Sequence, residues 1–313
     1  MKKRLKGKRV ALIGAPTDIG AGRRGGSMGP EALRIAGLKA AINRLGFDAE
    51  DRGDLTGPVN PGAEPMNGYR HLRQVVAWNE AVRNAVHQAL KDGDFPVVMG
   101  GDHSLAVGST AGVSRYCAEA GKPLTVLWLD AHADFNTPAS SPTGNIHGMP
   151  VSFICGHGPS ELAGLGAFTP MLDPSAIVQV GVRSVDAVEK RLVAESGLIV
   201  HDMRRIDEYG MRAVMKEALD QVRRRNGHLH VSFDVDFLDP SIAPGVATAV
   251  PGGPTYREAQ LCMEMIHDCG LMASLDVMEL NPVFDDHNKT AELVVELIES
   301  LFGEQTLARS SKP

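Results

Sequence analysis

The chain has 313 residues, of which 43% are hydrophobic and 22% charged, and its formal net charge is −6 at pH 7. A chain of this length and composition can bury a large core, while its acidic balance and its 5% of aromatic residues argue against a nucleic-acid-binding surface. The apolar run VALIGA near the N-terminus is too short for a signal-peptide core or a membrane span.

Short apolar runs alternate along the chain with stretches of helical periodicity. The eight runs typical of strands cover residues 9–16, 48–54, 95–101, 124–130, 176–182, 198–202, 228–236 and 273–280. Stretches with apolar residues at i, i+3 and i+4 predict helices. These stretches cover residues 29–46, 69–91, 103–121, 185–196, 206–225, 255–270 and 287–303.

This alternation predicts a mostly parallel sheet with helices on both faces. About eight strands fit either an open, doubly wound sheet or a closed barrel, and the alternation by itself does not choose between them. We find no repeat, low-complexity block or linker, so we expect one domain over residues 1–313, with a mobile tail at 304–313.

The four cysteines, at positions 117, 155, 262 and 269, form no CxxC pair. This usage is typical of reduced thiols in an intracellular protein. We therefore expect a cytoplasmic protein that binds neither nucleic acid nor membrane.

Unusual chemistry follows four of the predicted strands. Ligands bind at the carboxyl ends of strands in open α/β sheets, and side chains at i, i+2 and i+4 of a strand can point to one side. We therefore expect the residues of each such group to converge. The groups are Asp102-His103-Ser104, Asp130-Ala131-His132-Ala133-Asp134, Asp234-Val235-Asp236 and Glu279-Leu280-Asn281-Pro282.

Each of these groups taken alone also suits a turn or a helix cap. Together, however, four carboxylates and two imidazoles would repel strongly unless cations were present. Oxygen and nitrogen ligands without a thiolate favour Mn²⁺ or a similar ion over structural zinc. Six ligands suit two ions if some carboxylates bridge them, and a two-metal site can generate a hydroxide nucleophile. Two dications, four carboxylates and one hydroxide leave a charge of −1, which a cationic substrate would neutralise.

Five sequence motifs, taken together, are characteristic of a known protein family. Together, in this order and at this spacing, they resemble those of the ureohydrolase (arginase/agmatinase) family, and of the arginases within it. The resemblance covers nearly the whole chain and implies a three-layer α/β/α fold around a mostly parallel sheet of about eight strands, with two Mn²⁺ ions per chain. The motifs are GGDHS at 100–104, DAHADFNT at 130–137, GNIHGMP at 144–150, SFDVDFLDP at 232–240 and MELNP at 278–282.

The resemblance also implies a role for each ligand. His103 and Asp134 would bind one manganese ion, and His132 and Asp236 the other. Asp130, which the family pattern makes catalytic as well, and Asp234 would bridge both ions.

Two further residues resemble the family's proton shuttle and its guanidinium anchor. His147 would deliver a proton to the departing nitrogen. Glu279 would pair with the substrate guanidinium and direct its carbon toward a metal-bridging hydroxide, since a carboxylate fork suits that planar cation.

Arginases and agmatinases differ in whether the substrate carries an α-carboxylate. By resemblance, Asn136, Ser141 and Thr143 would contact that carboxylate, Asp186 would bind the α-amino group, and Thr248 would be a further substrate contact. The chain departs from the family pattern where Ser184 replaces a common acid, and where Ala247 and Ala249 replace glycine and proline.

The resemblance thus implies hydrolysis of L-arginine to L-ornithine and urea by a closed homo-oligomer, a trimer or hexamer. One alternative is an agmatinase or another guanidino-acid amidinohydrolase. Another, of a different class, is a metal-binding protein that has lost turnover. A third is a two-metal phosphoesterase, although the motifs contain no arginine or lysine clamp for a phosphate.

Overall fold

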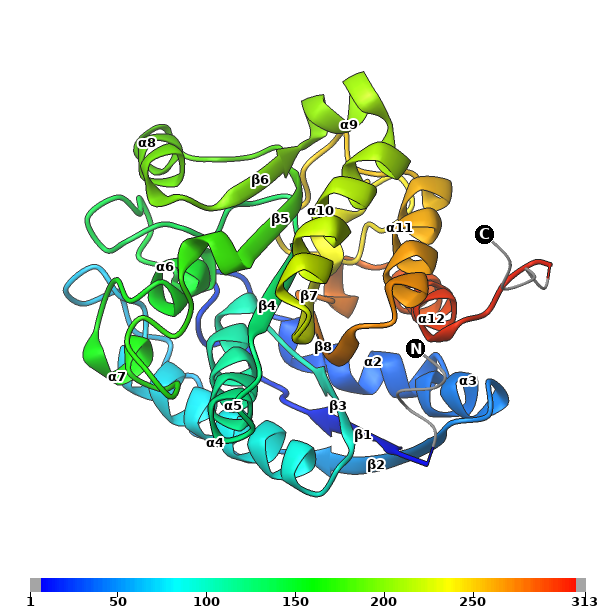
Figure 1. Ribbon diagram of the computed structural model, residues 1–313. Coiled ribbons are helices and arrows are strands. Elements are labelled where there is room, and N and C mark those ends of the chain that lie inside the picture. Colours follow the sequence, from blue (N-terminus) through cyan, green and yellow to red (C-terminus); the bar gives the residue numbers. More distant parts are fainter. Residues whose placement is uncertain (1–6, 308–313) are drawn as a thin grey trace.

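A computed structural model describes residues 7–307 and shows a single eight-stranded sheet between layers of helices (Figure 1). The strand order is β2-β1-β3-β8-β7-β4-β5-β6, and every neighbouring pair is parallel. With β2 and β6 as its edges the sheet is open, which confirms the predicted fold class and excludes the barrel. The strands are β1 (Arg9–Gly14), β2 (Asp48–Asp54), β3 (Phe95–Met99), β4 (Leu124–Leu129), β5 (Ile177–Val182), β6 (Ile199–Asp202), β7 (His228–Asp234) and β8 (Met272–Met278).

Helices cover both faces because the central strands are apolar on both sides. Leu127 and Leu129 of β4 belong to the core under one face, and Val126 and Trp128 to the core under the other. The first face carries α2 (Gly29–Ile35), α3 (Leu38–Arg44), α9 (Met203–Tyr209), α10 (Met211–Arg225), α11 (Tyr256–Cys269) and α12 (Lys289–Phe302). The second carries α4 (Leu72–Lys91), α5 (Ala106–Glu119), α6 (Pro150–Ile154), α7 (Ser160–Ala163) and α8 (Ala187–Ser196).

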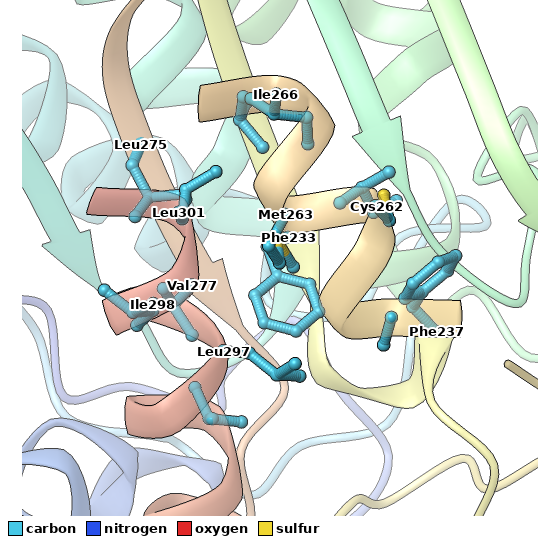
Figure 2. Packing of buried hydrophobic residues seen from close by; sticks show 14 of the residues in the cluster. Phe233, Phe237, Cys262, Met263, Ile266, Leu275, Val277, Leu297, Ile298 and Leu301 are labelled. Carbon is cyan, nitrogen blue, oxygen red and sulfur yellow. The ribbon is translucent and has the colours of Figure 1, made fainter. Parts of the chain in front are cut away.

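Figure 2 shows the core under the first face, where α11 and α12 meet the sheet. Phe233 of β7 and Val277 of β8 pack against Met263 of α11 and Ile298 of α12, and all four side chains are fully or almost fully buried. Burying an aromatic or large aliphatic side chain stabilises the fold by about 1.5–3 kcal/mol each. This packing holds β7 and β8 at the centre of the sheet.

Two stretches predicted as single helices are each divided by a glycine. The stretch 29–46 forms α2 and α3, which separate at Gly37 with φ +85°. The stretch 206–225 is divided between α9 and α10 at Gly210, with φ +80°. Glycine takes such left-handed conformations without the steric penalty that a Cβ atom imposes. The apolar spacing continues through both glycines, and it therefore did not indicate that the chain turns there.

The predicted tail at 304–313 is described only as far as residue 307, and the rest lies outside the described residues. Within residues 7–307, none of the helices combines the length and the apolar character that crossing a membrane requires.

Candidate metal centre and substrate pocket

The four strands that precede the unusual groups are neighbours in the sheet, in the order β3-β8-β7-β4. Their carboxyl ends therefore meet at one edge, and the turns that follow bring the predicted ligands together. Strand alternation is not what makes them converge, because β4 already ends at Leu129 and Asp236 lies in a 3₁₀ turn after β7. Asp134 turns back into the cluster with φ +50°, a conformation uncommon outside glycine.

One group of ligands surrounds the imidazole of His103. Its Nδ1 atom lies 3.1 Å from Asp130 Oδ2, 3.2 Å from Asp134 Oδ2 and 2.8 Å from Asp234 Oδ2. All four side chains are buried. His103, Asp130 and Asp134 lie close enough to hold one metal ion together.

A second group surrounds His132, whose ring is half-buried at the floor of a cavity. Its Nδ1 atom lies 3.0 Å from Asp236 Oδ2 and 3.5 Å from Asp130 Oδ1. Asp130 thus turns one oxygen toward each histidine, and it belongs to both groups that could hold a metal ion. This is the placement that a bridging carboxylate requires.

Among residues 7–307, two buried polar atoms of the cluster are left without hydrogen bonds, as expected of a site for divalent cations. Within the described part of the chain, His103 Nδ1 and Asp134 Oδ2 are buried and have no hydrogen-bond partner, although other ligand atoms lie close by. Buried polar atoms are seldom left unpaired, and charged ones are paired or bind metal. The donor set of carboxylate oxygen and imidazole nitrogen suits Mn²⁺ and similar ions.

The electrostatics of the cluster point the same way. Burial raises the pKa of Asp134 to about 7, with a further contribution from the Asp130 carboxylate. Burial and the carboxylates of Asp236 and Asp130 also raise the pKa of Asp234 well above its usual range. Burial lowers the pKa of His103, but Asp234 and the other carboxylates outweigh it and raise that pKa well above its usual value. The cluster therefore takes up positive charge, which bound dications would supply by displacing protons.

Hydrogen bonds to the backbone and to neighbouring side chains orient the carboxylates. Trp128 Nε1 donates to Asp130 Oδ2 at 2.8 Å, and Thr248 Oγ1 donates to Asp236 Oδ2 at 3.1 Å. The predicted substrate contact Thr248 thus lines the cavity and also holds a predicted metal ligand.

Behind His103, the strand spacing indicates only His230, which lies on the same side of its strand as Asp234 and Asp236, whereas sequence reasoning missed Ser232 and Asp276. Ser232 Oγ lies 2.9 Å from His103 Nε2 and donates to Asp276 Oδ1 at 2.6 Å, while His230 Nε2 lies 3.0 Å from Asp276 Oδ2. These residues sit on β7 and β8 and face α5, where Ser109 also donates to Asp276. In both strands, polar residues recur at every second position of an otherwise apolar run. This alternation was the sequence signal that could have identified them.

His147 and Glu279 form a pair beside the cluster. His147 Nδ1 lies 2.9 Å from Glu279 Oε1, which also accepts a hydrogen bond from the backbone nitrogen of His103. Burial lowers the pKa of His147, but the Glu279 carboxylate outweighs it and raises that pKa to about 9. Glu279 has φ +65°, a left-handed conformation that aims its side chain back over the site.

A cavity of about 270 Å³ opens above His132 and Asp134. The structure brings the residues predicted to contact the amino-acid end of the substrate to its walls, together with Thr248 and His147. Glu279 is buried next to His147 and is not part of the lining. The predicted residues in the lining are Asn136, Ser141, Thr143, His147, Asp186 and Thr248.

The cavity walls differ in chemistry. Asp186 and Glu189 make one wall acidic, whereas Ser141, Thr143 and Asn145 make another wall neutral and polar. Asp186 begins α8, and Glu189 completes a capping box with it. Neither Glu189 nor Asn145 was predicted, although acids spaced as in Asp186-x-x-Glu189 before a helix are the sequence signature of such a box.

Asn136 also lines the cavity, and its Nδ2 atom donates to Asp186 Oδ2 at 3.0 Å. Ser184 lines the same cavity and contributes a neutral side chain where an acid is common in the family that the motifs resemble.

Comparisons with known proteins match nearly the whole chain. The model of the Arginase family matches residues 8–303. The chain is 44% identical over 303 residues to an arginase of Brucella melitensis, covering 95% of this chain and 97% of the relative. It is 43% identical over 305 residues to an arginase of Bacillus caldovelox, covering 96% of this chain and all of that relative. The native structure of the Bacillus caldovelox arginase at pH 5.6 superimposes with a TM-score of 0.91 at 42% identity, covering 96% of this chain and 100% of that one.

Proposed function

Because the chain belongs to the arginase family, we propose that it hydrolyses L-arginine to L-ornithine and urea with two Mn²⁺ ions per chain. The observation that carries the proposal is the polarity of the cavity. Its floor is the His/Asp cluster, where the guanidinium would react, and its walls offer acids and neutral donors for the α-amino and α-carboxylate groups.

We assign one ion to His103, Asp134 and the two shared carboxylates, and the other to His132, Asp236 and the same pair. The shared carboxylates are Asp130 and Asp234. When bound, the ions would make a nucleophile from water at neutral pH, because coordination lowers the pKa of water. The chain's own contribution is to hold five of these ligands in two groups that share Asp130, with Asp234 against His103.

Glu279 is placed to orient the guanidinium. Its Oε1 atom is occupied by His103 N and His147 Nδ1, whereas Oε2 has no hydrogen-bond partner among residues 7–307. That oxygen can accept a guanidinium N–H in a charge-assisted hydrogen bond. We propose that Glu279 holds the guanidinium carbon over the cluster.

His147 is placed to move a proton to the leaving nitrogen. The leaving group of guanidinium hydrolysis is an amine, which departs only when its nitrogen is protonated. Since the Glu279 carboxylate raises the pKa of His147 to about 9, the imidazole carries a proton at neutral pH. His147 lines the cavity, so it can reach a substrate nitrogen there.

The amino-acid end of arginine would lie against the outer walls. Asp186 would bind the α-amino group, and Ser141 and Thr143 have hydroxyls that accept only backbone N–H groups and can donate to the α-carboxylate. Asn136 would share its amide between Asp186 and that carboxylate. Thr248 would border the substrate while it holds Asp236.

Three further properties rest on the resemblance and the sequence alone. We propose that residues 1–313 form one catalytic domain, that the protein works in the cytoplasm, and that it assembles as a closed homo-oligomer, a trimer or hexamer.

The test is urea release by the manganese-loaded protein, with L-arginine and agmatine measured side by side. We expect turnover of arginine and little of agmatine, because agmatine offers no carboxylate to the neutral wall. Turnover of agmatine alone would replace the proposed substrate with a decarboxylated guanidine. A protein that binds two ions and releases urea from neither would contradict the proposed reaction.

A further inference from the structure

A segment far from the family motifs lies directly against the neutral wall of the cavity. Residues 65–71 precede α4, and they contact the loop that carries Ser141 and Thr143. A Cβ atom on Gly68 would lie 2.7 Å from Pro138 Cβ, and one on Gly144 would lie 3.0 Å from Pro65 Cβ, so the two backbones approach as closely as glycine permits. The backbone nitrogen of Arg70 donates to Gly144 O at 2.8 Å.

The segment is itself held in place. Met66 and Tyr69 exchange backbone hydrogen bonds of 2.9 and 3.1 Å, and the Tyr69 ring packs against Phe153 of α6 at 6.4 Å between centroids. The buried His71 ring lies 2.9 Å from Ile19 O and 2.8 Å from Ala63 O. Residues 65–71 therefore form a fixed support behind the cavity loop.

Arg70 connects the segment 65–71 to one side chain that lines the cavity, Asn145. The Nε atom of Arg70 donates to Asn145 Oδ1 at 2.7 Å. A guanidinium only donates hydrogen bonds, so the amide of Asn145 must turn its oxygen toward Arg70. The Nδ2 group of Asn145 lies beside Gly22 and donates to no other residue in the described part of the chain, so it is free to donate to an acceptor in the cavity that Asn145 lines.

We propose that Arg70 is a specificity-determining positioning residue, which holds Asn145 so that its NH₂ group donates to the α-carboxylate of the substrate. This inference rests on the proposed function and adds a donor to its neutral wall, beside Ser141 and Thr143. Arg70 itself touches no substrate. It acts through Asn145 and through the backbone of Gly144.

Two substitutions separate the donor from its support. Asn145→Asp keeps an oxygen for Arg70 but turns a second, negatively charged oxygen toward the carboxylate. We expect the KM for arginine to rise about tenfold or more, since a hydrogen bond to a charged group is lost and a repulsion added. Arg70→Ala frees the amide to rotate, and we expect a smaller rise in KM with kcat changed less than about threefold. Arg73→Ala removes the same charge three residues away and is the matched control.

Product-like inhibitors isolate the carboxylate. L-Ornithine and putrescine both carry two amino groups, and putrescine lacks only the α-carboxylate. We expect Asn145→Asp and Arg70→Ala to weaken inhibition by ornithine and to leave inhibition by putrescine unchanged or stronger. The double variant Arg70→Ala/Asn145→Ala should match Asn145→Ala alone, because the side chain of Arg70 acts through that amide and its backbone bond to Gly144 remains in both variants.

An unchanged KM and ornithine inhibition constant in Asn145→Asp would overturn the proposal. Additive effects in the double variant would overturn the positioning role, and the effect of Arg70→Ala would then be attributed to the lost charge alone. Equal losses toward ornithine and putrescine would indicate general damage to the cavity and would equally contradict it. Failure of the proposed function shows separately, as absence of urea release from arginine by the unsubstituted protein.

Discussion

His103 and Ser232 are joined by a hydrogen bond whose direction a third residue determines. Ser232 Oγ donates its single hydrogen to Asp276 Oδ1 at 2.6 Å, so it can only accept from His103 Nε2 at 2.9 Å. Nε2 of His103 therefore carries a proton, which leaves Nδ1, the nitrogen that faces the carboxylates, as the one that can bind a metal ion. A histidine that binds metal depends on such an acceptor for its other nitrogen.

Ser232→Ala should therefore weaken metal binding without touching the substrate. We expect the affinity for Mn²⁺ to fall about 10–100-fold, the range seen for comparable outer ligands, while the KM for arginine at saturating Mn²⁺ stays unchanged. Equilibrium titration with Mn²⁺ checks this. Ser274→Ala is the control, because Ser274 contacts His230 and His228 but not Ser232 or Asp276. Wild-type affinity in Ser232→Ala would show that the ring of His103 is oriented by packing alone, such as its stacking on Trp128 at 4.2 Å.

Glu279→Gln should retain both metal ions and lose catalysis. Glutamine keeps an oxygen for the backbone nitrogen of His103 but loses the charge that pairs with the guanidinium. We expect kcat to fall about 10²–10³-fold, as for other preorganised electrostatic contacts. The measurement is turnover together with metal content on the same sample. A loss of bound metal would instead assign Glu279 a structural role through His103.

Asp130→Asn should abolish turnover. Both oxygens of Asp130 accept hydrogen bonds, one from Trp128 Nε1 and the other from His132 N. The NH₂ group of an asparagine would face one of these N–H donors and the metal ions, and it could bind neither. We expect loss of one ion and no measurable urea release. Full activity of a fully metal-loaded variant would contradict the bridging assignment.

We expect the stability of the protein to depend on pH through His201, which lies on the edge strand β6. Its side chain on β6 is buried, and neither ring nitrogen has a hydrogen-bond partner within residues 7–307. Burial lowers the pKa of His201, outweighing the carboxylate of Glu217, while Arg205 lowers it further and Asp202 raises it.

Because the pKa of His201 is lower in the folded than in the unfolded chain, the unfolded chain binds more protons between the two values. This stability is complete above the unfolded pKa of about 6.5 and is lost as the pH falls toward the folded pKa. Urea unfolding between pH 8 and pH 5 should show a falling midpoint, with a shallower slope in His201→Leu. An identical slope would exclude His201 as the cause.

The fold class and the candidate residues of the site could be predicted from the amino-acid sequence. Apolar runs on both faces of each central strand require that both faces be covered, which predicts a parallel sheet in an α/β fold. The strand order of the structure shows that this sheet is open and is not a barrel. Each motif is a short continuous segment whose spacing can be read from the sequence. His103, Asp130 and Asp234 could therefore be predicted as ligands before any contact between them was known.

How those residues meet could not be predicted, because it depends on the packing of the folded chain. The order β3-β8-β7-β4 joins strands distant in sequence, and left-handed turns at Asp134 and Glu279 aim two side chains back into the site. The support of His103 by Asp276, and of Asn145 by Arg70, spans 173 and 75 positions of the chain. Such contacts leave no periodicity or spacing in the sequence, because they depend on which segments the packed core brings side by side.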